Sequence, residues 1–370
     1  MQRQPPVYVT KPILPPMEAF LPLLQEIWES RILTNNGPLL QRFEAALAEY
    51  LGAEHLSVVA NATLGLLLSL RHKGVTQEVI TTPFSFAATG HVIRWAGAEP
   101  VFADIDPQTL NLDPAEVERR ITPRTQAILA VHCYGTPCET DALAEIARRH
   151  GLALIYDAAH AFGVRTAQGP LCTAGDLSVL SFHATKVFNT FEGGVIVAPD
   201  RETKLALDRL GNFGIEDEDT IPEAGINAKM SELGAAAGLA LLPHVDAAIA
   251  ARAQVAARYA EGLGDVTGLR LVCPPGRSGH NSYAFPILLG PDYPLSRTAL
   301  IERLRAAGIF ARRYFHPLIS DLPMYRDLPS AAPGGLPVAC DAAARILCLP
   351  IYPDLKESDQ MRIIEIVRGS

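Results

Sequence analysis

One lysine lies among residues whose types suit a covalently bound cofactor. Lys186 ends the run SFHATK at residues 181–186, and the pair Gly193 and Gly194 follows shortly after it. Asp157 lies 29 residues before Lys186 and directly follows the apolar run LALIY. An amine can condense with an aldehyde, and a carboxylate can keep a pyridine nitrogen protonated. The pair therefore predicts a pyridoxal phosphate site, and with it an enzyme.

Each of these residues also has a plainer interpretation. A lysine that follows a strand is commonly exposed, and Asp157 is equally suited to capping a helix. A carboxylate at the end of a buried strand is costly unless it is paired, and a protonated pyridine nitrogen would be such a partner. His160 is either a hydrogen-bonded core histidine or a contact to the phenolic oxygen of the ring. Ser181 offers a hydroxyl to the phosphate.

Two further segments follow predicted strands at the same edge. Ala62 and Thr63 open a predicted helix, so their amides and the Thr63 hydroxyl suit a phosphate, although an ordinary helix cap is the commoner explanation of such a segment. Phe86, in the run PFSFAAT at residues 83–89, is suited either to stacking on a planar ring or to core packing. These segments add candidate cofactor contacts to the predicted site, but each also has a purely structural explanation.

The elements that must position these residues alternate between strand and helix. Short Val-, Ile- and Leu-rich runs are separated in most cases by helical patterns, such as 62–72, 86–96, 113–119 and 140–149. The strand-like runs are 56–60, 78–81, 99–103, 126–131, 152–156, 177–182 and 194–198. This rhythm predicts an α/β fold with a mostly parallel seven-stranded sheet covered by helices. Ligands of such sheets bind at the carboxyl ends of the strands.

The pattern changes after an Ala- and Leu-rich segment at 230–264, which predicts one long helix or two. Strand-like runs at 269–273, 281–288 and 309–313 and helices at 296–307 and 356–368 predict a smaller α+β domain, with a Pro-rich surface loop at 317–337. We therefore expect a large cofactor-binding domain at 1–245 and a small domain at 246–370. Helices at 17–31 and 39–51 precede the alternation.

Composition narrows the choice of partners. The chain has 370 residues, a net charge of −8 and no apolar run of membrane-spanning length, so neither nucleic acid nor a membrane is expected as a partner. The six cysteines are scattered and predict free thiols rather than a metal site. We expect a cytoplasmic protein without a metal.

At these residues the sequence resembles the DegT/DnrJ-type sugar aminotransferases, fold-type I pyridoxal phosphate enzymes that act on nucleotide-linked keto-sugars. The resemblance runs nearly end to end. It is carried by the stretches TNNGP (34–38), NAT (61–63), TTPFSFAAT (81–89), GAEPVFADID (97–106), VHCYGTP (131–137), DAAHAFG (157–163), GDLSVLSFHATK (175–186) and GINAKMSE (225–232).

The resemblance implies a role for each matching position. Lys186 would bind the cofactor covalently and carry the proton between the sugar carbon and the cofactor. Asp157 would hold the pyridine nitrogen and His160 the phenolic oxygen. Asn227 would reach the phosphate of a partner subunit, which implies a homodimer with shared sites. The ring-stacking residue and the phosphate-binding residues would be Phe86, Ala62, Thr63 and Ser181.

The sequence departs from the family pattern at two positions. Lys229 stands where the family has Arg, which puts a bidentate contact there in doubt. Ala62 stands where Gly is commoner, but it still offers its amide. His183, Tyr314 and His316 are plausible sugar contacts, and a surface loop explains the last two as well. Lys229 is a further candidate for binding the diphosphate.

The long shared stretches are most similar to the subgroup that makes 4-amino-4,6-dideoxyglucose on a dTDP carrier. This implies transamination of dTDP-4-keto-6-deoxyglucose with glutamate as the amino donor. The alternatives are a C3 aminotransferase acting on a dTDP-3-keto-6-deoxy sugar and a GDP-sugar 4-aminotransferase. A dehydratase of the same fold would carry His in place of Lys186. A non-catalytic regulator would need a further module, for which 370 residues leave no room.

Overall fold

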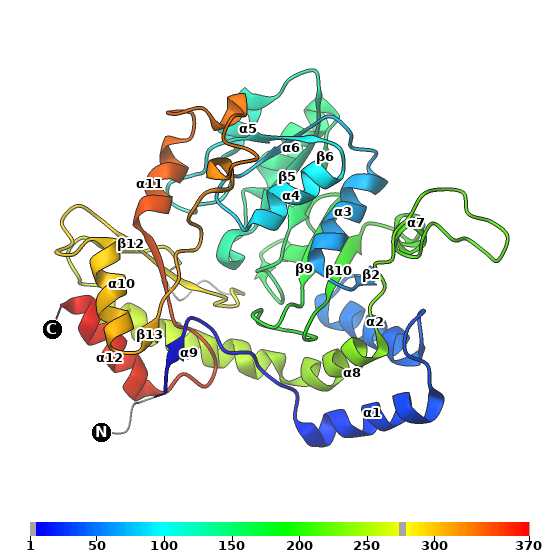
Figure 1. Ribbon diagram of the computed structural model, residues 1–370, viewed down its shortest axis with the longest axis horizontal. Coiled ribbons are helices and arrows are strands. Elements are labelled where there is room, and N and C mark those ends of the chain that lie inside the picture. Colours follow the sequence, from blue (N-terminus) through cyan, green and yellow to red (C-terminus); the bar gives the residue numbers. More distant parts are fainter. Residues whose placement is uncertain (1–4, 274–278, 370) are drawn as a thin grey trace.

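A seven-stranded sheet forms the centre of the larger part of the protein (Figure 1). The computed structural model describes residues 5–273 and 279–369. All neighbouring strands pair in parallel except for β10, which runs antiparallel to both of its neighbours. The strands, in sheet order, are β2 (His55–Val59), β10 (Gly194–Ala198), β9 (Leu177–Ser181), β6 (Ala153–Asp157), β5 (Thr125–Val131), β3 (Glu78–Thr81) and β4 (Glu99–Phe102). Each of the seven predicted runs therefore forms a strand of this sheet.

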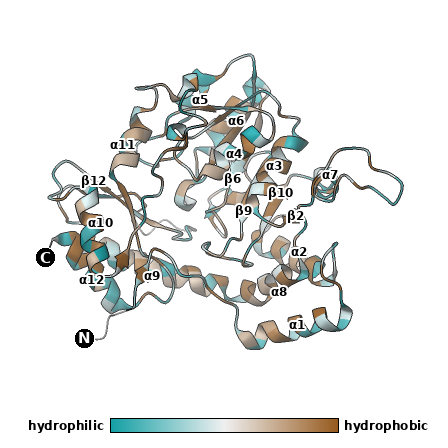
Figure 2. Cartoon of the chain, in the orientation of Figure 1, coloured by the Kyte–Doolittle hydropathy of each residue, from teal (hydrophilic) through white to brown (hydrophobic). Residues whose placement is uncertain are grey.

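Helices cover both faces of the sheet, as predicted. Alternate strand residues point to opposite faces, so Ile155 packs with one helical layer while Leu154 and Tyr156 pack with the other. The first layer contains α3 (Ala62–His72), α4 (Ala87–Trp95) and α7 (Arg201–Gly211). The second contains α5 (Pro114–Arg120) and α6 (Thr140–His150) and, further along the sheet, α1 (Met17–Ser30), α2 (Pro38–Leu51) and α8 (Glu232–Leu241). In Figure 2 brown, apolar residues are frequent in the central strands.

A second, smaller core lies around an antiparallel sheet of β11 (Leu269–Leu271), β12 (Phe285–Leu289) and β14 (Ile346–Leu349). Its helices are α9 (Val245–Leu263), α10 (Arg297–Ala306) and α12 (Glu357–Arg368). The short strand β13 (Ile309–Phe310) pairs with β1 (Val7–Tyr8), and Val7 is buried in this second core. The domain boundaries remain a prediction, but these first residues lie with the C-terminal part of the chain (Figure 1).

The structure corrects several details of the small domain. Residues 317–337 are not simply a surface loop, because Leu318, Tyr325 and Leu336 are buried in a core cluster between the two parts. The sequence analysis also missed α11 (Pro337–Arg345) and β14, two short elements whose register depends on tertiary packing. The expected strand at 281–288 begins only at Phe285, and that at 309–313 ends at Phe310.

The apolar segment at 230–264 forms two helices, α8 and α9, joined by a 3₁₀ turn at Leu242–His244. Among the described residues, the run Glu232–Leu263 is long and apolar enough to cross a membrane by length and composition. Half of its most apolar window is buried inside the protein, and α8 packs against α1 and α2. We therefore assign this run as a core helix pair.

Candidate active site

Asp157 and Ser181 are the last residues of β6 and β9, so both lie at the same edge of the large sheet. These strands are neighbours in the sheet, and Asp157 is paired in register with Val179. The side chain of Asp157 is buried, and its Oδ2 accepts a hydrogen bond from the Thr89 hydroxyl at 2.8 Å, while its Oδ1 accepts one from the Ala159 amide at 3.2 Å. Burial raises the pKa of this carboxyl, whereas the Thr89 hydrogen bond, the Ala159 amide and the charge of Lys186 oppose the rise.

Lys186 is half-buried in the loop that follows β9. Its amine donates to the hydroxyl of Tyr283 at 3.4 Å and lies 4.9 Å from the centre of that ring. Burial lowers the pKa of Lys186 to about 8, although the Asp157 carboxylate works in the opposite direction. Near neutral pH, a lysine in this setting is neutral far more often than an exposed one, so its amine is available as a nucleophile.

His160 is held as a neutral ring with a defined tautomer. Its Nδ1 accepts a hydrogen bond from the Tyr134 backbone amide at 3.2 Å, so the proton of the neutral ring resides on Nε2. Burial, together with the charge of Lys186, lowers the pKa of His160 well below its usual value. The ring stacks on Tyr283, with centroids 4.2 Å apart and planes inclined by 12°. His160 can therefore donate one hydrogen bond through Nε2.

The predicted phosphate turn forms the beginning of α3. The Asn61 side chain caps the helix by accepting from the Leu64 amide at 2.9 Å, so the cap interpretation holds for Asn61. The first backbone bond of the helix comes from Gly65, which leaves the earlier amides of Ala62 and Thr63 without an intrahelical acceptor. These two amides are free to bind an anion as well.

Gly194 brings this turn close to Ser181. As the first residue of β10, Gly194 is paired with Val59 on one side and with Ser181 on the other. A Cβ at position 194 would lie only 2.7 Å from the Ala62 amide nitrogen. A side chain here would therefore displace the turn, and glycine leaves the space between Ser181 and the helix start open. Amides, a hydroxyl, a lysine and a buried carboxylate are the groups that pyridoxal phosphate requires, so the residues fit this cofactor.

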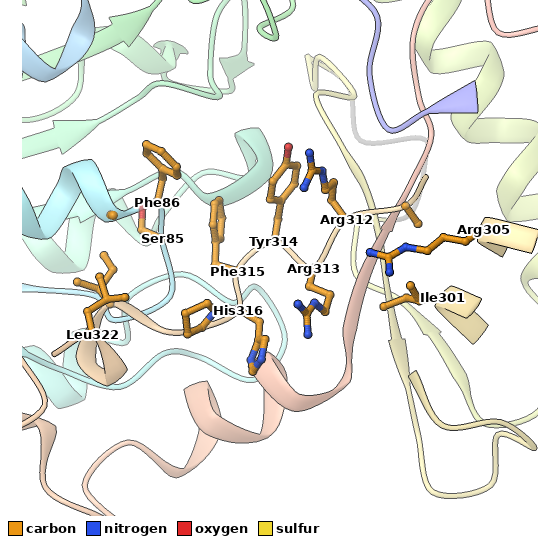
Figure 3. A pocket seen from close by; sticks show the side chains of 14 residues that line it. Ser85, Phe86, Ile301, Arg305, Arg312, Arg313, Tyr314, Phe315, His316 and Leu322 are labelled. Atoms are coloured by element: carbon orange, nitrogen blue, oxygen red, sulfur yellow. The ribbon is translucent and has the colours of Figure 1, made fainter. Parts of the chain in front are cut away.

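A cavity of about 300 Å³ brings three more of the predicted residues together, Phe86, Tyr314 and His316 (Figure 3). The Phe86 side chain is 66% exposed, and burial raises the pKa of Tyr314 to about 12. The pKa of His316 is lowered by partial burial and by the positive charges of Arg297 and Arg313. Stacking by Phe86 and sugar contacts by Tyr314 and His316 remain predictions for one shared space.

Three other predicted residues do not line this cavity. His183 is half-exposed, and its Nδ1 lies 2.8 Å from the Thr185 hydroxyl. Asn227 is exposed. It lies in the same turn as Lys229, whose backbone forms an isolated antiparallel bridge with Val59 of the edge strand β2. Lys229 lines a different cavity, of about 1090 Å³, where its amine donates to Asn212 at 2.8 Å. Within one chain, Lys229 is thus separate from the cavity of Phe86 and Tyr314.

The structure adds residues that the sequence analysis did not single out. Thr89 and Ser85 belong to the run around Phe86, and their spacing of four residues at a predicted helix start was the available signal. Tyr283 lies just before β12, and nothing in the sequence links it to Lys186. Arg305 reaches the 300 Å³ cavity from α10, and no local signal in the sequence separates it from the other charges of that helix.

Comparisons with known proteins agree with this geometry. The model of the DegT/DnrJ/EryC1/StrS aminotransferase family matches residues 17–368. The chain is 47% identical to a dTDP-4-amino-4,6-dideoxy-D-glucose transaminase of Shigella dysenteriae over 98% of each chain. The crystal structure of DesI in the presence of its TDP-sugar product matches with a TM-score of 0.94 and 38% identity, over 99% of this chain and 93% of DesI. NtdA of Bacillus subtilis with bound PMP matches with a TM-score of 0.87 and 27% identity, over 95% of this chain and 81% of NtdA.

Proposed function

The chain belongs to the DegT/DnrJ/EryC1/StrS aminotransferase family, and from this premise we propose that it transfers the amino group of glutamate to C4 of dTDP-4-keto-6-deoxyglucose. The product is dTDP-4-amino-4,6-dideoxyglucose, the sugar named in the relative that is 47% identical over 98% of both chains. The observation that carries the chemistry is the half-buried Lys186, with its pKa lowered to about 8, beside the buried Asp157. The family resemblance, the fold and the sugar-aminotransferase class predicted from the sequence are confirmed.

The proposed cofactor is pyridoxal 5′-phosphate. When bound, it supplies an aldehyde for the lysine and a ring that withdraws electrons from the reacting carbon. Asp157 would hold the ring nitrogen, and the Nε2 proton of His160 would reach the phenolic oxygen. The ring would stack on Phe86. The groups that would hold the phosphate are the amides of Ala62 and Thr63 and the hydroxyls of Thr63 and Ser181.

Lys186 acts as the proton carrier in this proposal. Its Nζ would accept the proton from the α-carbon of glutamate; the amino group stays behind in the site, and water supplies the keto oxygen of the 2-oxoglutarate that leaves. With the keto-sugar bound, the same Nζ handles the proton at C4 in the reverse direction. Its lowered pKa suits both directions, because a base and acid with a pKa near the working pH can accept and release a proton readily.

A second copy of the chain completes the site in this proposal. Asn227 is exposed at the edge of the large sheet, and Lys229 lines the 1090 Å³ cavity together with Phe213 and Asn36. In a homodimer, Asn227 of the partner subunit would reach the cofactor phosphate, and Lys229 of the partner subunit would approach the substrate diphosphate. The protein is proposed to act in the cytoplasm, with no nucleic acid, membrane or metal partner.

Positive charge for the diphosphate is available at the smaller cavity. Arg305, Arg312 and Arg313 line it, and Figure 3 shows Arg312 and Arg313 beside Tyr314. Replacing Arg312 by Gln should raise the KM for the sugar nucleotide by about tenfold, because a charge-assisted hydrogen bond to a phosphate is lost, and leave the KM for glutamate unchanged. Steady-state kinetics with each substrate varied in turn will measure both constants.

Arg303 offers a matched control for this variant. It is an exposed arginine on α10, like Arg305, but it does not line the cavity. Arg303→Gln should leave both KM values at those of the wild type. Equal KM values for the sugar nucleotide in Arg312→Gln and Arg303→Gln would remove Arg312 from the substrate site.

The function itself is tested by absorption spectroscopy and by the structure of the product. The purified protein should be yellow, lose its visible band when glutamate is added, and recover that band with dTDP-4-keto-6-deoxyglucose. The absence of any response to glutamate would refute the transaminase proposal. Nuclear magnetic resonance of the product should place the amine at C4, and an amine at C3 would refute the assigned regiochemistry. A GDP-linked keto-sugar as the better substrate would refute the dTDP carrier.

A further inference from the structure

Two buried hydroxyls connect the start of α4 to Asp157. The Ser85 hydroxyl lies 2.8 Å from the Thr89 hydroxyl, and the Thr89 hydroxyl donates to Oδ2 of Asp157, also at 2.8 Å. The side chains are almost fully buried, with relative exposures of 3% for Ser85 and 0% for Thr89. Phe86, the predicted ring-stacking residue, belongs to the same segment and is 66% exposed. One short stretch of chain therefore offers a ring contact on its open side and two hydroxyls on its buried side.

The direction of the hydrogen bonds in this chain is determined by the number of available protons. A hydroxyl has one proton to donate, and that of Thr89 is used for the Asp157 carboxylate. In the bond between the two hydroxyls, Ser85 must therefore be the donor and Thr89 the acceptor. Both dipoles point their positive ends towards Asp157, and such hydrogen bonds favour the ionised form of a carboxylate.

From this geometry we propose that Thr89 and, through it, Ser85 are positioning residues that keep Asp157 ionised and oriented towards the pyridine nitrogen of the cofactor. The inference rests on the proposed function. The hydroxyl of Thr89 and the amide of Ala159 each occupy one carboxylate oxygen, and every oxygen retains a further lone pair for the ring. Neither hydroxyl touches the reacting atoms, so neither residue is catalytic.

Other groups around Asp157 do not supply the same effect. Among the described residues, the titratable side chains that interact with Asp157 are Lys186, Cys133 and Tyr283. Burial raises the pKa values of Cys133 and Tyr283, so both are neutral and provide no positive charge. Lys186 provides positive charge only while its nitrogen is protonated, whether as the free amine or bound to the cofactor aldehyde, so its support varies with pH. Within this set, the hydrogen bonds from Thr89 and Ala159 are the support for an ionised carboxylate that does not depend on the protonation of Lys186.

The test is a pH titration of the visible band in the cofactor-loaded protein. Thr89→Val has nearly the same shape but lacks the hydroxyl, so Asp157 should hold the proton of the ring nitrogen less firmly. Because loss of positive charge on the ring favours protonation of the nearby lysine-bound nitrogen, the pH midpoint of the band should rise by about one unit. The dissociation constant of the cofactor, measured by fluorescence titration, should rise by about tenfold. Thr89→Ser should restore both values.

A matched control separates this role from ordinary core stability. Thr81 is also fully buried, and its hydroxyl donates at 2.7 Å to the Leu129 carbonyl rather than to Asp157. Thr81→Val should lower the melting temperature without moving the pH midpoint. Identical midpoints in Thr89→Val, Thr81→Val and the wild type would overturn the proposal.

Two further outcomes keep the result decisive. Ser85→Ala removes the second hydroxyl and should shift the midpoint upwards by less than Thr89→Val does. If Thr89→Val does not fold, an unchanged midpoint in Ser85→Ala overturns the proposal. A wild-type protein that does not respond to glutamate refutes the proposed function instead, whereas a responsive wild type with unaltered variants refutes only the inference.

Discussion

Replacement of Lys186 by alanine is expected to lower kcat by about 10⁴-fold or more, since it removes the proton carrier and the covalent attachment together. The variant should still bind pyridoxal phosphate, because Asp157, His160 and the amides at the start of α3 remain. Because no lysine nitrogen is joined to it, the bound cofactor should be released by gel filtration in denaturant even after borohydride treatment. Stopped-flow kinetics and mass spectrometry of the borohydride-treated protein will measure the two effects.

Two variants and the wild type serve as controls for Lys186. Lys186→Arg keeps the positive charge, but a guanidinium does not lose its proton and so cannot act as a nucleophile or a base. This variant should therefore be as inactive as the alanine variant. Lys73, whose amine lies 3.7 Å from Asp176, lines neither cavity, and Lys73→Ala should retain the covalent cofactor. In the cofactor-free wild type, the rate of covalent capture should rise with pH and level off above about 8, where the Lys186 amine is neutral. Substantial turnover by Lys186→Ala would contradict the assigned role.

The positions of Asp157 and Lys186 could be expected from the sequence because each comes at, or shortly after, the end of a strong apolar strand. β6 and β9 are recognisable as buried strands; β6 ends at Asp157, and Lys186 lies in the loop that follows the end of β9 at Ser181. Parallel strands place those ends at the same edge, so two residues far apart in sequence were expected to meet. His160 follows from the same logic, since it lies three residues beyond Asp157.

The rest of the site depends on contacts that no local pattern encodes. Tyr283 reaches Lys186 from the segment before β12, and its place depends on how the sheet of β12 packs against the larger sheet. Arg305 is one of several charges on α10, and only the fold brings it to the cavity that contains Tyr314. The pairing of β1 with β13 is equally hidden, because a two-residue strand carries no periodic signal. The strands could be predicted because their pattern is local. The partners of the site residues could not, because they come from distant segments of the chain.

Replacement of Asp157 by asparagine is expected to reduce kcat by roughly 100- to 5000-fold, because breaking a buried ion pair costs about 3–5 kcal/mol. Asn has nearly the same shape as Asp but no negative charge, so it cannot keep the ring nitrogen protonated. The Thr89 hydroxyl at 2.8 Å can still donate to the amide oxygen, and the local geometry should therefore persist. Single-turnover measurements with glutamate will report the loss directly, and the cofactor dissociation constant should rise in parallel.

Asp104 provides the matched control, because it is also a buried aspartate after a strand of the same sheet. Its carboxylate accepts from the Val338 and Ala339 amides, both at 2.8 Å, and so caps the start of α11. Asp104→Asn should lower the melting temperature and leave single-turnover kinetics near those of the wild type. Burial raises the pKa of Asp157 in the cofactor-free protein, so wild-type cofactor affinity should fall with decreasing pH at values above those usual for aspartate. Asp157→Asn should lack this dependence, and if both proteins lost affinity in parallel, the pH effect would have to come from a group other than Asp157.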